Sequence, residues 1–420
     1  MYLELDLSDL AVCSLKEVLT KISRTLARSY VVSLMLSICF CVTLVSAQSE
    51  SPRLLLTPKR LKRLQRDRER QTVRWIDFEN RVNSVSDSSE RGFELALYYA
   101  VTLNEKCGRQ AIQWALTHKC ATRQVALILD WCGTLASGEE RQKLTAPDCA
   151  AAISGRVAQL EPIRDALFMR IVRGENIDHL YTGNQLERFG LTDPRQLYAA
   201  CEYIEAVRET QHRDLRQDDN VFFQVLPAEF LLSMRPAEVG NPPWQASAAA
   251  LALVSLDPNL EGSQFLQGWA MEDRQMMREG PGVAYELLWG DPYLPGVSYQ
   301  NLDPWSYDPN GRLFARTDWN TGACWISISA HGTEEANCPA GWRQHAQTFG
   351  RMTLIPMAEP CIEVPRVKGR QVAIIWRLQP RQKITYVNEK KRVSSRADAA
   401  GLWVLPGYIE GEVCASTGQK

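Results

Sequence analysis

The stretch from Met277 to Ser329 reads MREGPGVAYELLWGDPYLPGVSYQNLDPWSYDPNGRLFARTDWNTGACWISIS. It is dense in Tyr, Trp, Gly, Pro and Asp. Before it, apolar side chains recur at helical spacing, and after it they recur at the alternating spacing of strands. The stretch therefore predicts where a helical part of the chain gives way to a β part. We expect a multidomain α+β protein with a helical domain over residues 48–290 and a β domain over residues 291–420.

The first 47 residues have the features of a secretory signal peptide. Basic residues precede an apolar run from Tyr30 to Val45, and the small residues Ser46 and Ala47 follow it. This order is typical of an export signal. The run is shorter than the roughly 20 residues of a spanning helix, and an uncleaved membrane anchor is the alternative. We expect a secreted or periplasmic protein with no stable membrane insertion after signal cleavage.

The charge balance argues against nucleic acid as a main partner. The chain has 48 Lys and Arg, 49 Asp and Glu, and a net charge of -1, whereas nucleic-acid-binding domains usually carry a basic excess. We find no Cys-x-x-Cys spacing, no His-Glu-x-x-His motif and no Gly-rich phosphate loop. The sequence therefore predicts neither a metal site nor a cofactor.

Cysteine usage fits an oxidising compartment. Three of the 12 cysteines lie in the signal region, which leaves nine in the mature chain. An odd number leaves at least one thiol unpaired. We expect Cys324, Cys338, Cys361 and Cys414 to form disulfides among themselves, with buried free thiols as the alternative.

The helical part contains many short amphipathic segments. Thr57 and Pro58 are typical of a helix start. One helix is expected from Pro58 to Val82. It is rich in Lys and Arg, which indicates either capture of an anionic polymer or a solvated face paired with acidic neighbours. Short Gly, Asp and Pro breaks favour an incomplete α/α toroid-like array or an irregular helical array. The further expected helices span residues 89–102, 109–117, 122–135, 139–144, 149–160, 162–172, 194–209, 227–234, 244–256 and 262–271, with a loop over 174–190.

The C-terminal part shows the alternation of strands from Gly311 onward. Turn residues at 309–311 and 320–322 favour hairpins. An antiparallel β-sandwich of reduced size is the economical architecture. The expected strands span residues 312–316, 324–330, 353–356, 362–365, 372–378, 384–387 and 402–405.

Two segments of the junction resemble the heparinase II/III-like group of polysaccharide lyases. Residues 279–285 read Glu-Gly-Pro-Gly-Val-Ala-Tyr and resemble the group's Glu-Gly-x-x-Tyr segment. Residues 313–319 read Leu-Phe-Ala-Arg-Thr-Asp-Trp and resemble its Phe-Arg-x-x-Trp strand. The resemblance covers the junction and first strands, and elsewhere only the general organisation. It implies an α/α toroid followed by a β-sandwich, and β-elimination on uronate-containing glycans.

The chain departs from that group further downstream. The group carries a motif of the form His-x-His-x-Asp-x-Gly-x-Phe early in the sandwich. Residues 345–352 here read His-Ala-Gln-Thr-Phe-Gly-Arg-Met. One His remains, whereas the second His and the Asp are absent. This difference argues against a metal site and for a weakened lyase.

Eliminative cleavage of a uronate needs a base, an acid for the leaving oxygen and a group that stabilises the developing charge. We expect Tyr285 to be the base or acid, because it ends the first segment that resembles the group. His345 is the expected partner. His212, followed by Arg213 and Asp214, is a candidate for neutralising the substrate carboxylate. The alternative for each is structural: a packed ring with a bonded hydroxyl, or a structural His.

The junction also supplies the expected substrate-binding residues. Charged and amide side chains would bind the carboxylate and hydroxyls of a sugar, and exposed aromatic rings stack on sugars. The expected set is Arg316, Asn301, Glu279, Tyr299, Trp305 and Trp319.

Three functions follow from these observations. The first is an exported lyase, with full or weakened activity, that acts on an acidic polysaccharide or oligosaccharide. The second is a non-catalytic exported protein that binds a glycan or a partner on the same scaffold. The third is a toroid glycoside hydrolase, which is supported only by the adjacent acids Glu272/Asp273 and Glu334/Glu335. Adjacent acids do not by themselves face each other across a glycosidic bond.

Overall fold

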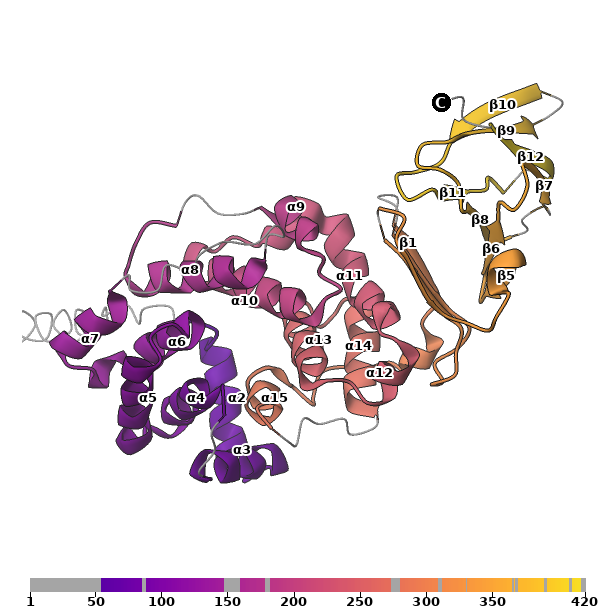
Figure 1. The fold of residues 1–420 in the computed structure, drawn as a ribbon. Coiled ribbons are helices and arrows are strands. Elements are labelled where there is room, and N and C mark those ends of the chain that lie inside the picture. The colour runs from indigo at the N-terminus through magenta and orange to yellow at the C-terminus, as the bar shows by residue number, and fades with distance from the viewer. Residues whose placement is uncertain are drawn as a thin grey trace, which may run out of the picture. The chain divides into compact units, whose positions relative to one another are not determined.

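The computed structural model of the chain describes residues 54–84, 88–146, 159–177, 182–272, 280–308, 312–329, 331–364, 366, 369–388, 391–407 and 410–416. These residues belong to one compact unit, Arg53–Lys420. A helix-rich part is followed by a C-terminal region of sheets (Figure 1). The expected signal peptide, most of the helix expected at 149–160, Glu279 and the turn at 309–311 lie outside the described residues.

The described part of the chain contains fourteen α-helices, and expected helices outside 149–160 have counterparts among them. They are α2 (Pro58–Glu69), α3 (Val73–Asn83), α4 (Arg91–Thr102), α5 (Glu105–Thr117), α6 (Thr122–Cys132), α7 (Gly138–Thr145), α8 (Leu160–Val172), α9 (Gly183–Leu186), α10 (Pro194–Gln211), α11 (Asn220–Ser233), α12 (Pro236–Gly240), α13 (Trp244–Leu256), α14 (Glu261–Glu272) and α15 (Gly282–Trp289). Short 3-10 turns are η1 (Gly133–Leu135), η2 (Glu187–Phe189), η3 (Leu215–Asp219), η4 (Tyr299–Asn301) and η5 (Trp342–Gln344).

Helix starts follow capping chemistry. The side chain of Thr57 accepts a hydrogen bond from the Arg60 amide at 3.2 Å, with Pro58 as the first residue of α2. Asp193 caps α10 in the same way, accepting from the Arg195 amide at 2.8 Å. These side chains satisfy amides that have no partner inside the helix.

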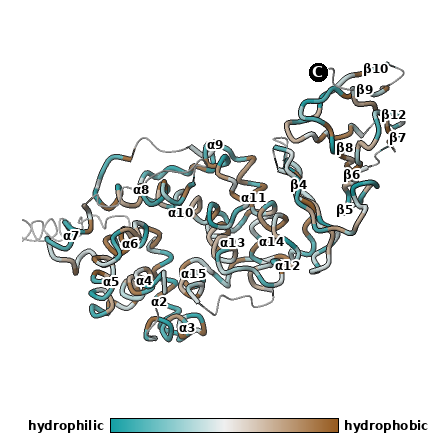
Figure 2. Tube along the Cα trace, in the orientation of Figure 1, coloured by the Kyte–Doolittle hydropathy of each residue, from teal (hydrophilic) through white to brown (hydrophobic). Residues whose placement is uncertain are grey.

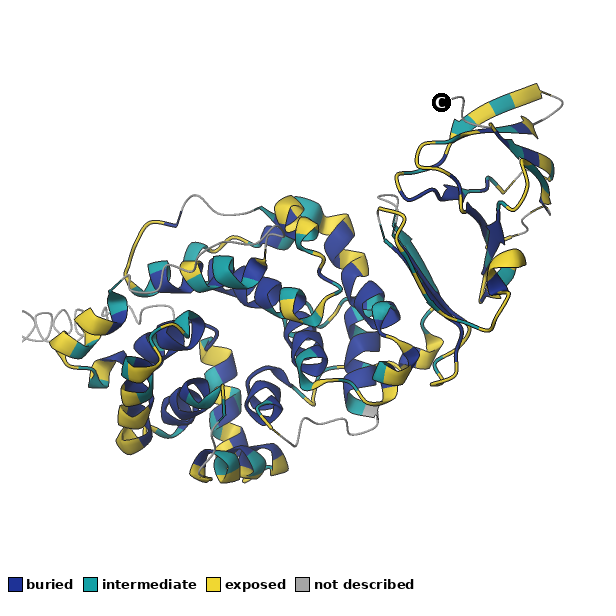
Figure 3. Cartoon of the chain, viewed as in Figure 1, coloured by how far each residue is buried: buried dark blue, intermediate teal, exposed yellow. Residues whose placement is uncertain are grey.

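Two helices form the centre of the helical part. In α10 residues 199–207 are all buried, and in α13 residues 246–254 are all buried. The two helices pack against each other, and hydrophobic residues run along α13 (Figure 2). A helix that is buried on all sides is a core element rather than a surface layer (Figure 3).

Three helical predictions need correction. One basic helix was expected from Pro58 to Val82, but the chain breaks into α2 and α3, and Gln71 between them has a φ of 48. A helix was expected to begin at Pro227, but Pro227 lies inside α11, whose N-cap is Asp219. The loop expected over 174–190 contains α9 and η2. Pro227 was interpreted as a boundary although α11 continues through it, whereas the break at Gln71 was not expected.

The strands form three sheets of four strands each among the described residues. They are β1 (Trp305–Asp308), β2 (Arg312–Arg316), β3 (Trp325–Ile328), β4 (Glu334–Asn337), β5 (Gln347–Phe349), β6 (Met352–Pro356), β7 (Cys361–Val364), β8 (Val372–Trp376), β9 (Lys383–Asn388), β10 (Lys391–Arg396), β11 (Trp403–Val404) and β12 (Gly411–Ala415). The sheet orders are β1-β2-β3-β4, β10-β9-β12-β7 and β11-β8-β6-β5.

The prediction of wholly antiparallel pairing is wrong at one place. β6 and β8 are parallel, with Leu354 opposite Ile374. Between them the chain forms β7 in a different sheet and then returns, and such a crossover places two strands of one sheet in the same direction. The other strand pairs are antiparallel.

The sheet that contains β6 and β8 contributes to two cores. Ile374 and Trp376 of β8 pack in a cluster with residues of β2 and β3, whereas Ala373 and Ile375 pack in a second cluster with residues of β9 and β12. Successive residues of a strand face opposite sides, so β8 is buried on both faces. Its sequence therefore reads as a continuous apolar run.

The disulfide prediction for the C-terminal cysteines is confirmed. Cys324 is bonded to Cys338, and Cys361 is bonded to Cys414. Buried free thiols occur as well, at Cys107, Cys132 and Cys201. Among the described helices none is both long and apolar enough to cross a membrane.

Candidate functional site

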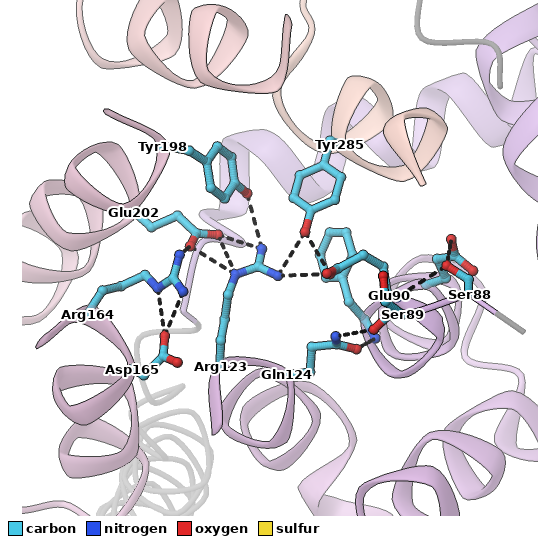
Figure 4. Close-up of polar contacts among 12 residues, drawn as sticks. Ser88, Ser89, Glu90, Arg123, Gln124, Arg164, Asp165, Tyr198, Glu202 and Tyr285 are labelled. Carbon is cyan, nitrogen blue, oxygen red and sulfur yellow. Dashed lines mark hydrogen bonds and ion pairs between the residues drawn. The ribbon is translucent and has the colours of Figure 1, made fainter. Parts of the chain in front are cut away.

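A buried network of charged side chains and tyrosines lies in the helical part (Figure 4). Its centre is Arg123, the second residue of α6, which is 7% exposed. The Arg123 Nε donates to both oxygens of Glu202, at 3.0 and 2.9 Å, and its Nη2 donates to Glu202 at 2.6 Å. Arg164 of α8 donates to the same carboxylate at 2.8 Å. One carboxylate of α10 thus holds two guanidinium groups.

Tyr285 joins this network from α15. Its hydroxyl donates to Glu90 at 2.7 Å and accepts from Nη1 of Arg123 at 3.0 Å. Glu90, at the N-cap of α4, also accepts a hydrogen bond from Nη1 of Arg123 at 3.3 Å. Tyr198 of α10 accepts from Nη2 of Arg123 at 3.1 Å, one turn before Glu202. The positions of both tyrosine hydroxyls are therefore fixed by charged partners.

The pKa values in this network follow from burial and from the neighbouring charges. Burial by itself would raise the pKa of Glu202, but Arg123 and Arg164 outweigh it and lower that pKa. Burial raises the pKa of Tyr285 well above its ordinary value; Arg123 opposes the shift and Glu90 adds to it. Glu202 is therefore ionised, and the Tyr285 hydroxyl keeps its proton and donates it in a hydrogen bond to Glu90.

The network borders a cavity of ≈ 180 Å³. One water needs only about 10–15 Å³ of such space, and drug-sized sites start at about 300 Å³. The cavity is therefore suited to a single small ring with its substituents. Its lining residues are Glu90, Arg123, Glu161, Arg164, Pro194, Arg195, Tyr198, Trp244, Gln245, Ala248 and Tyr285.

Most of the lining residues come from the beginnings of helices. Arg123 is the second residue of α6, Glu161 the second of α8, Arg195 the second of α10 and Trp244 the first of α13. Tyr285 lies in the first turn of α15. Helix N-termini carry partial positive charge and amides without intrahelical partners. Their convergence gives the cavity a bias towards oxygen-rich and anionic ligands.

Aromatic rings and unpaired polar groups form the remaining walls. The half-buried ring of Trp244 lies 5.0 Å from that of Tyr285, and the ring of Tyr198 lies 5.3 Å from it. The side chains of Glu161 and exposed Arg195 have no ion pair or hydrogen bond with the described part of the chain. Arg123, Arg164 and Glu90 already have internal partners, whereas Glu161 and Arg195 have none among the described residues and are open to a ligand.

The structure brings Tyr285 into this site but not the two expected histidines. His345 follows η5 in the β part and is exposed. His212 is the exposed C-cap of α10, at the opposite end of that helix from Tyr198. No described contact joins either His to Tyr285. Their expected roles beside Tyr285 therefore have no geometric support.

Three of the expected substrate-binding residues form a second cluster. Arg316 on β2 is 0% exposed and its guanidinium lies 4.1 Å from the centre of the Trp319 ring. Its Nε donates to the Asp318 carbonyl at 3.0 Å, and burial lowers its pKa to about 10. Tyr299 meets Trp319 edge to face at 5.1 Å. These residues pack together, and none of them lines the cavity.

The other expected substrate-binding residues also lie outside the cavity. Asn301 is exposed at the end of η4. Trp305 on β1 packs against the core formed by β2, β3, β6 and β8. Glu279 lies outside the described residues. Among the described residues one Cys/Glu group has metal-ligand spacing, but its cysteines, Cys361 and Cys414, form a disulfide.

Sequence reasoning missed Arg123, Glu202, Arg164, Tyr198 and Trp244. Each lies in a segment that was expected to be helical, where charged residues are usually solvated. The available signal is position: four of the five lie in the first two turns of a helix, and Tyr198 and Glu202 share a face at a spacing of four. The chain matches no protein-family model, and a comparison with curated proteins finds no match.

Proposed function

We propose that the protein binds a saccharide that carries a carboxylate, in the cavity beside Tyr285, Tyr198 and Trp244. The observation that supports this best is the combination of aromatic walls with polar side chains that have no described partner. The Trp244 ring offers an apolar face at the side of the cavity. Glu161 accepts hydrogen bonds from sugar hydroxyls, and Arg195 at the start of α10 binds the carboxylate.

The finer architecture belongs to the same proposal. An incomplete α/α toroid would place the N-termini of several helices around one cavity, and the lining residues from the first turns of α6, α8, α10, α13 and α15 support this proposal. A β-sandwich packs the inner faces of two sheets against each other, and the core that joins β2 and β3 with β6 and β8 supports this packing. A secreted or periplasmic location is supported by the two disulfides of the C-terminal part, because disulfides persist in oxidising compartments.

A second candidate function, β-elimination on a uronate, is favoured by the hydrogen bond from Tyr285 to Glu90. In such a step the Tyr285 proton moves to Glu90, and the phenolate oxygen takes the proton beside the sugar carboxylate. The C–H electron pair forms the C=C bond and the C–O bond breaks. The leaving oxygen then takes the proton of the re-formed Tyr285 hydroxyl, and Tyr285 recovers its own proton from Glu90. The raised pKa of Tyr285 works against the first transfer, so binding without catalysis ranks first.

The test combines calorimetry with the ultraviolet absorbance of unsaturated uronates. The ligands are short oligosaccharides from heparan, chondroitin, alginate and pectin, with neutral cello-oligosaccharides as the uncharged arm. We expect wild type to bind a uronate and Trp244→Ala to bind it about tenfold more weakly, a difference of about 1.4 kcal/mol. Trp114→Ala is the matched control, because Trp114 is a half-buried ring on α5 that does not line the cavity.

Two further variants separate the candidates. Arg195→Gln should weaken uronate binding and leave a neutral sugar unaffected. Tyr285→Phe keeps the ring and removes the proton, so a lyase would lose its absorbance signal while still binding ligand. If wild type binds no uronate on this panel, or if Trp244→Ala binds as tightly as Trp114→Ala, the proposed function is wrong.

A further inference from the structure

One face of α2 carries a row of basic side chains. Lys59, Lys62, Arg66 and Arg70 are all exposed. Their spacing of three or four residues places them on the same side of the helix. From the first to the last they span about 16 Å at 1.5 Å per residue. None of the four side chains has an ion pair or hydrogen bond with the described part of the chain.

The same face lines a cavity of ≈ 780 Å³. Its walls carry three more cationic than acidic side chains. The lining also includes Tyr293, which is 75% exposed although its side chain is large and aromatic. A ring this exposed beside a basic surface gives a ligand both charge and an apolar face.

Buried neighbours hold the floor of this groove in place. Arg60 forms an ion pair with buried Glu205 at 3.0 Å, and its guanidinium lies 4.3 Å from the centre of the Trp289 ring. Arg63 donates to the Leu288 carbonyl at 2.6 Å. The neighbouring arginines of α2 are thus engaged inside the protein. The basic residues of α2 therefore fall into two sets: Arg60 and Arg63 have internal partners, whereas the side chains of the exposed row have none among the described residues.

We propose that this groove, formed by the open row of α2 and by Tyr293, binds a stretch of a linear anionic polysaccharide longer than the unit held in the smaller cavity. The proposal rests on the proposed function only for the glycan class. The two sites share a wall, because Trp289 of the groove donates to the Tyr198 hydroxyl of the cavity at 2.9 Å.

Charge and aromatic content favour a glycan over a nucleic acid. Single-stranded nucleic acids are held by several rings on which successive bases stack, whereas the groove offers one exposed ring. The whole chain also lacks the basic excess of a nucleic-acid-binding protein, with a net charge of -1. A groove with a local cationic row in a near-neutral protein is suited to the evenly spaced carboxylates or sulfates of a glycan.

The experiment measures the affinity of the full-length protein for alginate (carboxylate only) and heparan sulfate (carboxylate and sulfate) oligosaccharides of increasing length. The groove variant replaces Lys59, Lys62, Arg66 and Arg70 with Gln. The matched control replaces four exposed cations that line neither site with Gln, namely Lys106, Arg109, Lys391 and Arg392. Both variants lose the same charge, and circular dichroism checks that both are folded.

We expect affinity to rise with chain length in the wild type and in the control variant, and to stop rising in the groove variant. The slope of log Kd against log salt should fall by about 3 in the groove variant, at roughly 0.7 per cation as for single-stranded polyanions. Whether the length effect appears with alginate or only with heparan sulfate tells which anionic group the groove prefers.

The outcomes of the two proposals are distinguishable. If the groove variant binds long chains as the control does, the groove assignment is overturned while the cavity proposal stands. If wild type binds long chains through the groove but binds no short uronate, the cavity proposal fails and the groove stands. Binding of single-stranded DNA as tight as that of the best glycan overturns the glycan assignment.

Discussion

Replacement of Glu202 by Gln tests the energetic centre of the buried network. Glu202 is 0% exposed and accepts hydrogen bonds from two guanidinium groups, those of Arg123 and Arg164. Gln keeps one acceptor oxygen and turns an NH₂ group towards the arginines. Removal of one partner from a buried ion pair leaves charge uncompensated and costs about 3–5 kcal/mol. We therefore expect Glu202→Gln to lower the free energy of unfolding by an amount in that range, with both arginines contributing.

The assay is urea unfolding followed by tryptophan fluorescence, with Glu139→Gln as the control. Glu139 makes an exposed ion pair with Lys143, a kind of pair that contributes little. A double variant, Glu202→Gln with Arg164→Met, removes one of the stranded charges and should regain part of the loss. A Glu202→Gln loss under about 1 kcal/mol, or strict additivity in the double variant, would refute the idea that uncompensated charge is the cause.

The same variant has a defined pH dependence. The folded-state pKa of Glu202 is lowered below the reference value of 4.5. Its ionisation therefore contributes stability that is fully present above about pH 4.5 and is lost as the pH falls through the folded-state pKa. The stability difference between wild type and Glu202→Gln should be constant from about pH 6 to 8 and should narrow below about pH 4.5. A difference that does not narrow in acid would contradict this assignment.

Two further predictions concern stability. A Cβ at Gly268 would lie 1.9 Å from the Val297 carbonyl oxygen, so Gly268→Ala should lower the free energy of unfolding by about 1–3 kcal/mol or more. The control is Gly138→Ala, where nothing lies within 4 Å of the new Cβ, and it should cost less than about 0.5 kcal/mol. Equal effects of the two variants in thermal unfolding would contradict the steric reasoning. Replacement of both Cys361 and Cys414 by Ser removes a bond across 53 residues and should cost about 4 kcal/mol by loop entropy, measured by urea unfolding without reductant; no change in the midpoint would show that the bond does not constrain the unfolded chain.

Much of the helical part was readable because local rules and packing agree there. The start of α2 follows from the capping residues Thr57 and Pro58. The limits of α13 follow from a run of mostly apolar residues. Pro227 failed as a boundary because a proline inside α11 is held by its buried surroundings. Among the strands, β8 was found because it is apolar throughout, whereas the partly exposed β10 was missed because its apolar alternation is weak.

The candidate site was less readable than the fold. Tyr285 was singled out by a family resemblance, and the structure gives its hydroxyl two charged partners, Glu90 and Arg123. His345 was chosen for its sequence neighbourhood, but the β part holds it at an exposed position. Arg123 and Glu202 lie 79 residues apart in the chain. Without the helix packing, no local pattern shows that these two charges meet.

The all-round burial of α10 has a consequence for the dynamics of the protein. Its amides from residues 199 to 207 belong to residues with almost no solvent contact. Glu202 and Glu205, the buried glutamates that pair with arginines, both lie on this helix. Local fluctuations free the amides of surface helices such as α7, but amides in a central helix exchange with solvent only when a large cooperative unit opens. In deuterated water, the α10 amides should therefore be among the last in the helical part to exchange.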